Sequence, residues 1–139
     1  MLTTSVLAKE ADVPVYTVRH YTRIGLITPL RRHTNGYKVF KDSDISTIRF
    51  IRNARSLGFT LKEIGHILDM AKLGLTPCPT VREIVLRRIT ENRAKIETLR
   101  RLQEKMEEAK SAWTKMPDSV PNGDSVCHLI EAFDDKNRY

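Results

Sequence analysis

The beginning of the chain alternates between segments with helical apolar spacing and a segment with strand spacing. Val6 and Leu7 lie behind hydroxyl residues that can cap a first turn, which predicts a short helix over residues 3–11. A second helix is expected from Pro14, because proline is tolerated in a first helical turn. The Asn-Gly pair at residues 35–36 precedes a strand-like run and predicts a β-hairpin, which we interpret as a wing.

Two more helices are predicted after the hairpin. Asp42 or Ser43 can cap the first of them, and Gly58 is expected to end it. Thr60 and Glu63 have the spacing of a capping box, in which each residue satisfies a backbone N–H of the other. The sequence therefore predicts that another helix begins here.

A much longer helix is predicted near the middle of the chain, because neither Gly nor Pro occurs from residue 80 to 116. Its apolar residues recur at steps of three, four and seven and form a seam of near-heptad period, flanked by Glu, Lys and Arg: Ile89, Ile96, Leu99, Leu102, Met106, Ala109 and Trp113. We expect this seam to join two copies of the chain as a parallel or antiparallel coiled coil. A helix packed lengthwise on its own domain is disfavoured, because the N-terminal core is small.

These elements predict a mainly α fold in three parts. Residues 1–76 form a winged helix-turn-helix domain, residues 77–116 a dimerisation helix, and residues 117–139 a loop with a short helix over 126–133. A chain of 139 residues can bury one modest core and is too short for a large catalytic scaffold. Because it has no signal-like start and no apolar run that could span a bilayer, we expect a soluble cytoplasmic protein without a membrane partner.

Basic residues dominate the N-terminal part. The formal charge of the chain is +7; residues 1–76 contain 12 basic and 6 acidic side chains, whereas residues 77–139 contain 12 and 11. Neutralising phosphates requires clustered Lys and Arg, so this distribution is typical of a polyanion-binding module joined to a near-neutral assembly element. It favours nucleic acid as a partner.

Four stretches closely resemble the MerR family of transcription regulators: TVRHY at 17–21, GLITP at 25–29, NGYKVF at 35–40 and ARSLGFTLKEI at 54–64. The resemblance implies a homodimer that binds an inverted-repeat site in double-stranded promoter DNA and, with an effector, changes the DNA conformation for RNA polymerase. The chain departs from the family at Thr22, where Glu is common, and at Lys38, where Arg is common. Both retain the phosphate-binding chemistry, although Lys lacks the bidentate fork of Arg.

The expected DNA contacts come from three elements. The second helix can enter a major groove, while the hairpin and the third helix add positioning contacts to the backbone; the candidates are Tyr16, Thr17, Arg19, Tyr21, Arg31, Arg32, Tyr37, Lys38 and Arg55. For Tyr21 core packing is an equal alternative, and Phe40 is interpreted as a core residue. His20 and His33 are interpreted as solvated side chains without a chemical role.

Cys78 and Cys127 are too few and too far apart in the sequence for a disulfide scaffold. In metal-responsive members of the family, a ligand near the start of the dimerisation helix of one subunit joins loop ligands of the other, and these cysteines occupy matching places. The resemblance implies a divalent metal ion of the Zn, Cd, Pb or Hg class. Those members usually have a second loop cysteine nine residues earlier, where this chain has Asp118, so Asp118, Asp124 or His128 is expected to complete the site.

Three alternatives remain open from the sequence. The first is a regulator of the same fold that responds to thiol oxidation or to an organic ligand, with the cysteines as redox thiols or small buried residues. The second is a nonspecific architectural DNA-binding protein, which gives the two cysteines no role. A metal-storage or redox enzyme is poorly supported, because no paired carboxylates, Cys-x-x-Cys, nucleotide-binding glycine loop or Ser/His/Asp set is present. We therefore expect no enzyme.

Overall fold

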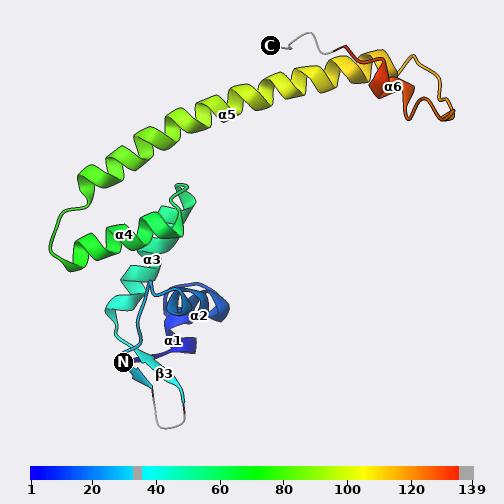
Figure 1. The fold of residues 1–139 in the computed structure, drawn as a ribbon. Helices are drawn as coiled ribbons and strands as arrows, with labels where there is room; N and C mark the ends of the chain where they lie inside the picture. Colours follow the sequence, from blue (N-terminus) through cyan, green and yellow to red (C-terminus); the bar gives the residue numbers. More distant parts are fainter. Residues whose placement is uncertain (33–35, 135–139) are drawn as a thin grey trace. The chain divides into compact units, whose positions relative to one another are not determined.

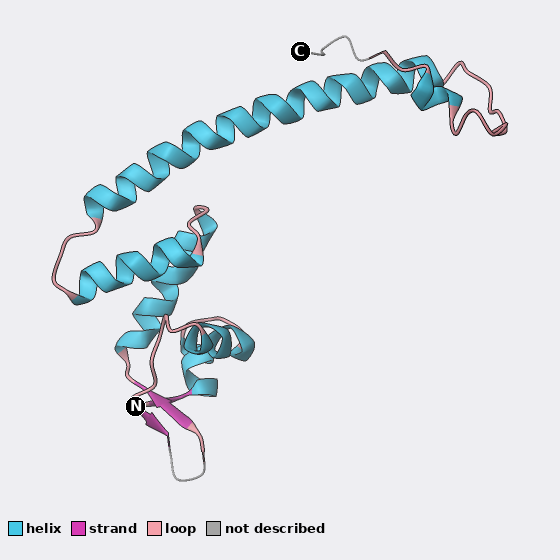
Figure 2. Cartoon of the chain, in the orientation of Figure 1, coloured by secondary structure: helices cyan, strands magenta, loops and turns pink. Residues whose placement is uncertain are grey.

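The computed structural model describes residues 1–32 and 36–134, with the backbone alone for residues 31 and 32. Within this part of the chain the fold is mainly helical, as predicted, and three short strands accompany the helices (Figures 1 and 2). Contacts divide the chain into two compact units, Met1–Ile84 and Val85–Tyr139. The predicted division at residues 76 and 116 stays a prediction.

The predicted wing is part of a three-stranded antiparallel sheet. Strands β2 (Arg31–Arg32) and β3 (Lys38–Phe40) form the expected hairpin. Asn35 of the predicted turn lies outside the described residues, and Gly36 adopts a φ of 87°, which favours glycine. The order of the sheet is β1-β3-β2, and β1 (Leu2–Thr3) was not predicted from the sequence. Two residues are too few to show an alternating pattern.

The first two helices form the predicted helix-turn-helix pair. Helix α1 (Thr4–Glu10) is capped by Thr3, whose Oγ1 accepts a hydrogen bond from the N–H of Val6 at 3.3 Å. Helix α2 (Val15–Arg23) follows Pro14, which stands at its N-terminal boundary in an extended conformation. Both helices thus begin within one residue of the predicted positions.

The capping box predicted for the fourth helix is confirmed in α4 (Leu61–Lys72). Thr60 Oγ1 accepts from the N–H of Glu63 at 3.1 Å, and Glu63 Oε1 accepts from the N–H of Thr60 at 2.9 Å. The preceding helix α3 (Ser43–Ser56) ends as expected before Gly58, which has a φ of 89°. These local signals fix the turn between α3 and α4.

The side-chain cap predicted for α3 is wrong. Asp42 precedes the helix but makes no capping hydrogen bond, and Ser43 is already the first helical residue. The backbone of Asp42 is helical, with φ −61° and ψ −32°, whereas a capping residue needs an extended conformation to reach the first turn. Its carboxylate instead lies 3.7 Å from the N-terminal amine of Met1.

One hydrophobic core holds α1, α2, β3 and α3 together. Phe40 is fully buried in it, which confirms its interpretation as a core residue, and the other buried members are Leu7, Ala8, Ala11, Val18, Ile27 and Ile48. Burying each large aliphatic or aromatic side chain contributes about 1.5–3 kcal/mol. Because Val18 of α2 and Phe40 of β3 share this core, it fixes the helix and the wing relative to each other.

Helix α5 (Cys78–Trp113) has 36 residues, and its predicted bounds are corrected at both ends. It begins at Cys78, because Pro79 in a first turn has no N–H that needs an intrahelical partner. It ends at Trp113, three residues before the predicted end. Helix α6 (His128–Glu131) is shorter than the predicted 126–133, since Cys127 is extended with φ −147° and ψ 110°.

Candidate functional site

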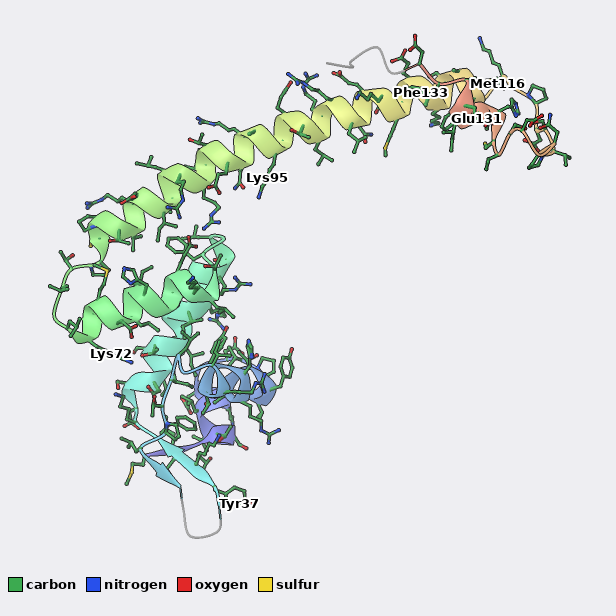
Figure 3. The ribbon with its side chains drawn as sticks, viewed as in Figure 1. Tyr37, Lys72, Lys95, Met116, Glu131 and Phe133 are labelled. Carbon is green, nitrogen blue, oxygen red and sulfur yellow. The ribbon has the colours of Figure 1, made fainter. Side chains whose placement is uncertain are left out.

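A basic hollow of about 700 Å³ lies between α2 and the wing. Arg19 and Arg23 of α2 line it, as do Lys38 and Tyr37 of the wing; Tyr37 is labelled in Figure 3. The remaining lining residues are Thr3, Thr4, Ser5 and Gly36. Because this lining holds three basic side chains and no acidic one, the hollow suits an anion such as a DNA phosphate.

Two exposed tyrosines flank the basic residues. Tyr16 on α2 is 73% exposed and Tyr37 on the wing is 68% exposed. Thr17 is half-buried and Arg19 is exposed on the same helix. Tyrosine combines an apolar ring with a hydroxyl that can donate to phosphate, so its exposure on this basic face is consistent with the predicted DNA contacts.

The structure gives other predicted DNA-binding residues additional roles. Tyr21 is half-buried and packs against the hydrophobic core. Arg55 Nη1 donates to the carbonyl oxygen of Phe59 at 2.8 Å, which stabilises the turn after α3, and Arg55 does not line the hollow. Arg31 and Arg32 lie in strand β2, and their side chains are outside the described part. Their DNA contacts stay predictions.

Sequence reasoning missed Arg23. Arg23 follows Arg19 by four residues, so both lie on one face of α2, and this spacing was the signal that could have identified it. Arg23 Nη2 lies 2.9 Å from His20 Nδ1. The interpretation of His20 as a solvated side chain stays a prediction, and His33 lies outside the described residues.

The C-terminal loop brings some of the predicted metal ligands into one ordered segment. The carboxylate of Glu131 accepts hydrogen bonds from the N–H groups of Val126 and Cys127, at 3.3 and 3.1 Å. His128 Nδ1 lies 2.5 Å from Ser119 Oγ, which joins the two ends of the loop. These bonds give the half-buried Cys127 and His128 a defined backbone conformation.

The other predicted ligands are not gathered there. Cys78 is an exposed free thiol at the start of α5, and Asp118 is exposed. The N–H of Asp124 donates to Asn122 Oδ1 in a local turn. Across the described ranges, no group of three or more His, Cys, Asp or Glu side chains could hold a metal ion within one chain. The predicted metal set stays a prediction.

The apolar seam of α5 is largely exposed in the single chain. Ile96 is 65% exposed and Leu99 is 64% exposed, and Ile89, Leu102 and Met106 are exposed as well. Near the end of α5, Trp113 Nε1 donates to the carbonyl oxygen of Leu129 at 2.9 Å and ties α6 to the helix. Met116 and Phe133 line a small hollow there (Figure 3).

Charged side chains on α5 pair within the helix. Arg100 bonds to the carboxylates of both Glu97 and Glu104, and Arg101 bonds to Glu97 at 3.3 Å. The hydrogen bond from Arg100 lowers the pKa of Glu97 to about 2. These ion pairs lie within the helix, whereas apolar side chains of the seam such as Ile96 and Leu99 are exposed in the single chain.

The fold and the basic hollow define a winged helix-turn-helix protein of the DNA-binding class. The model of the MerR HTH family of regulatory proteins matches residues 2–71, and the MerR DNA-binding model matches residues 45–109. The chain belongs to the MerR family of transcription regulators. This confirms the expected family and agrees with a regulator rather than an enzyme.

Several known members of the family are similar to the chain over most of its length. The mercuric resistance operon regulatory protein of Bacillus cereus is 30% identical over 127 residues, covering 91% of this chain and 92% of that protein. The heavy metal-dependent transcription regulator 2 of Rhizobium meliloti is 32% identical over 95 residues, which are 68% of this chain. That match spans 65% of the relative, just under two thirds of its length.

A solved structure supports the same assignment. The transcription regulator PbrR691 from Ralstonia metallidurans CH34, in complex with lead(II), superposes with a TM-score of 0.75 at 27% identity. The superposition covers 95% of this chain and 98% of that one. In the part of the chain that the structure describes, no helix has the length and apolar character needed to cross a membrane.

Proposed function

We propose that the chain is a homodimeric, metal-responsive regulator that binds an inverted-repeat promoter site. The observation that carries the proposal is the basic hollow formed by α2 and the wing. Arg23 and Lys38 of the hollow supply phosphate contacts, and the exposed side chains of α2, Arg19 among them, supply base contacts in a major groove. The exposed seam of α5 supports the dimer.

The seam supplies the driving force for pairing two copies. Its exposed members are large aliphatic side chains, including Ile96, Leu99 and Met106. Transferring apolar surface out of water contributes about 25 cal/mol per Å², so covering a row of such side chains favours association. Two copies related by a twofold axis present two identical reading helices, which is the symmetry that an inverted repeat requires.

The donor chemistry of the cysteines suits a divalent metal ion. Cys78 and Cys127 are free thiols, and the imidazole of His128 and the carboxylate of Asp118 are donors that zinc accepts together with thiolates. With one loop thiolate where metal-responsive members commonly have two, the set favours Zn²⁺ over the softest ions. The lead complex of PbrR691 and the name of the mercuric resistance regulator support a metal effector in this chain.

The family resemblance indicates which copy supplies each donor. In metal-responsive members, a ligand near the start of the dimerisation helix of one subunit joins loop ligands of the other. Cys78 is the first residue of α5, and Cys127 stands at the N-terminal boundary of α6. We therefore infer a site that takes Cys78 from one copy and Cys127, with His128 or Asp118, from the other.

A site shared between two copies couples the effector to the DNA. Binding stabilises the arrangement of the dimer in which the donors of both copies meet, and it shifts the equilibrium only by its differential affinity for that arrangement. A change in the separation of the two basic hollows bends or twists the bound promoter, which RNA polymerase then reads. When bound, the metal ion supplies the link between thiolates of different copies.

Titration of the reduced protein with Zn²⁺, Cd²⁺, Pb²⁺, Hg²⁺ and Cu⁺ tests the effector class. We expect two divalent ions per dimer, with loss of the ultraviolet signature of free thiol as thiolate bonds form. Zn²⁺ is expected to compete effectively with Cd²⁺ and Pb²⁺ for the site, because the donors combine thiolates with an imidazole or a carboxylate. Absence of stoichiometric binding by any divalent ion would rule out the metal-responsive function and would favour thiol oxidation, measured in parallel with peroxide.

A further inference from the structure

The last turn of α2 contains a side-chain hydrogen bond between an arginine and a histidine. Arg23 Nη2 lies 2.9 Å from His20 Nδ1, three residues earlier in the helix. A guanidinium has donors and no acceptor, so His20 Nδ1 must be the acceptor. The imidazole in this bond is therefore neutral and carries its proton on Nε2.

The surroundings of this pair preserve the charge of Arg23. Helix α2 contains no acidic residue, and the hydroxyl of Thr22 donates to the carbonyl oxygen of Val18 at 2.7 Å. Within α2, His20 orients the guanidinium through a neutral acceptor.

Arg23 also lines the basic hollow, together with Arg19 and Lys38. Three like charges in one hollow repel each other, and an arginine side chain has many rotamers, so a free guanidinium would spend little time facing a phosphate. A hydrogen bond that restricts the rotamers reduces the entropy lost on binding. The bond from Arg23 to His20 has this effect without adding a negative charge.

We propose that His20 is a positioning residue that holds Arg23 in the hollow for contact with a DNA phosphate. The inference rests on the proposed DNA-binding role of the hollow. His20 raises the affinity for DNA by acting through Arg23, and it makes no base contact of its own. The effect is independent of the DNA sequence, because phosphate contacts carry no base information.

Two substitutions of His20 separate positioning from a structural role. His20→Asn keeps an acceptor, because the Asn Oδ1 stands the same number of bonds from Cα as the imidazole Nδ1. His20→Leu keeps the approximate bulk and removes the acceptor. Each is measured alone and with Arg23→Ala, using a fluorescent duplex that the wild-type protein enriches from a random pool, over a series of salt concentrations.

We expect His20→Leu to weaken binding about threefold to tenfold and His20→Asn to stay close to wild type. Arg23→Ala should reduce the salt slope by about 0.9 per subunit, and adding His20→Leu to it should have no further effect. Three results would each overturn the inference. The affinity for the duplex could fall equally in His20→Asn and His20→Leu, or it could stay unchanged in His20→Leu. His20→Leu could also lower the affinity by the same factor in the Arg23→Ala protein as in the wild type. Wild-type protein that binds no duplex would instead refute the proposed function.

Discussion

Replacing Arg19 by Ala is expected to abolish binding to the operator at physiological salt and to leave the dimer intact. Arg19 is exposed on α2 and lines the basic hollow, so its loss removes a DNA contact without disturbing the core. An arginine contact to a base is worth about 1–3 kcal/mol, and a dimer contributes two such contacts. The combined loss of about 2–6 kcal/mol corresponds to a drop of about thirtyfold to about twenty-thousandfold in affinity.

The matched control is Lys62→Ala, which removes one positive charge from an exposed position on α4 outside the hollow. Fluorescence anisotropy with the enriched duplex gives the affinities, and sedimentation gives the oligomeric state. Lys62→Ala is expected to retain most of the affinity, since distant exposed charges are screened. Similar affinities for the Arg19→Ala protein and the wild type would remove α2 from the interface.

Changing Cys127 to Ser should eliminate the metal response and preserve operator binding. A serine hydroxyl is not deprotonated at neutral pH and is a poor ligand for zinc, so the shared site loses a principal donor. Serine is a strongly preferred N-cap, and Cys127 stands at that position of α6, so the fold of the loop is expected to survive. We expect the Zn²⁺ affinity to fall at least about a hundredfold, because substitutions of residues that only orient a metal ligand already lower metal affinity about tenfold to a hundredfold.

Trp113 provides the measurement, because it is the single tryptophan of the chain and its indole bonds to the backbone of Leu129. Its fluorescence should change when wild-type protein binds Zn²⁺ and stay constant in Cys127→Ser. Val126→Ser is the control, since Val126 is the neighbouring residue and is 82% exposed. An ordinary Zn²⁺ response from the Cys127→Ser protein would exclude this thiol as a ligand.

Local sequence signals predicted the DNA-binding unit well because each of them acts within a few residues. The Thr60 and Glu63 capping box forms as expected, and the positive φ of Gly58 follows α3. Strand β1 was not predicted because it forms by pairing with β3, whose residues are distant in the sequence. The expected Asp42 cap is missing because the backbone of Asp42 is already helical, which the residue type alone does not reveal.

The candidate sites were predictable to different degrees. Helical periodicity placed Arg19 on the exposed face of α2, and the same periodicity also includes Arg23. The pairing of His20 with Arg23 depends on side-chain rotamers, which no pattern of residue types encodes. The predicted metal donors stand at the start of α5 and in the loop, and no group of such side chains among the described residues could hold a metal ion, so their assembly stays a prediction.

The most direct test of the account is the mass of the complex between the full-length protein and its enriched duplex, measured by sedimentation. We predict two protein copies per duplex, with an inverted repeat whose half-sites are separated by one helical turn or a multiple of it. Variants with charged residues at Leu99 and Met106 should lose this complex together with the dimer. A single copy bound with equal affinity to repeat-containing and random duplexes would contradict the account.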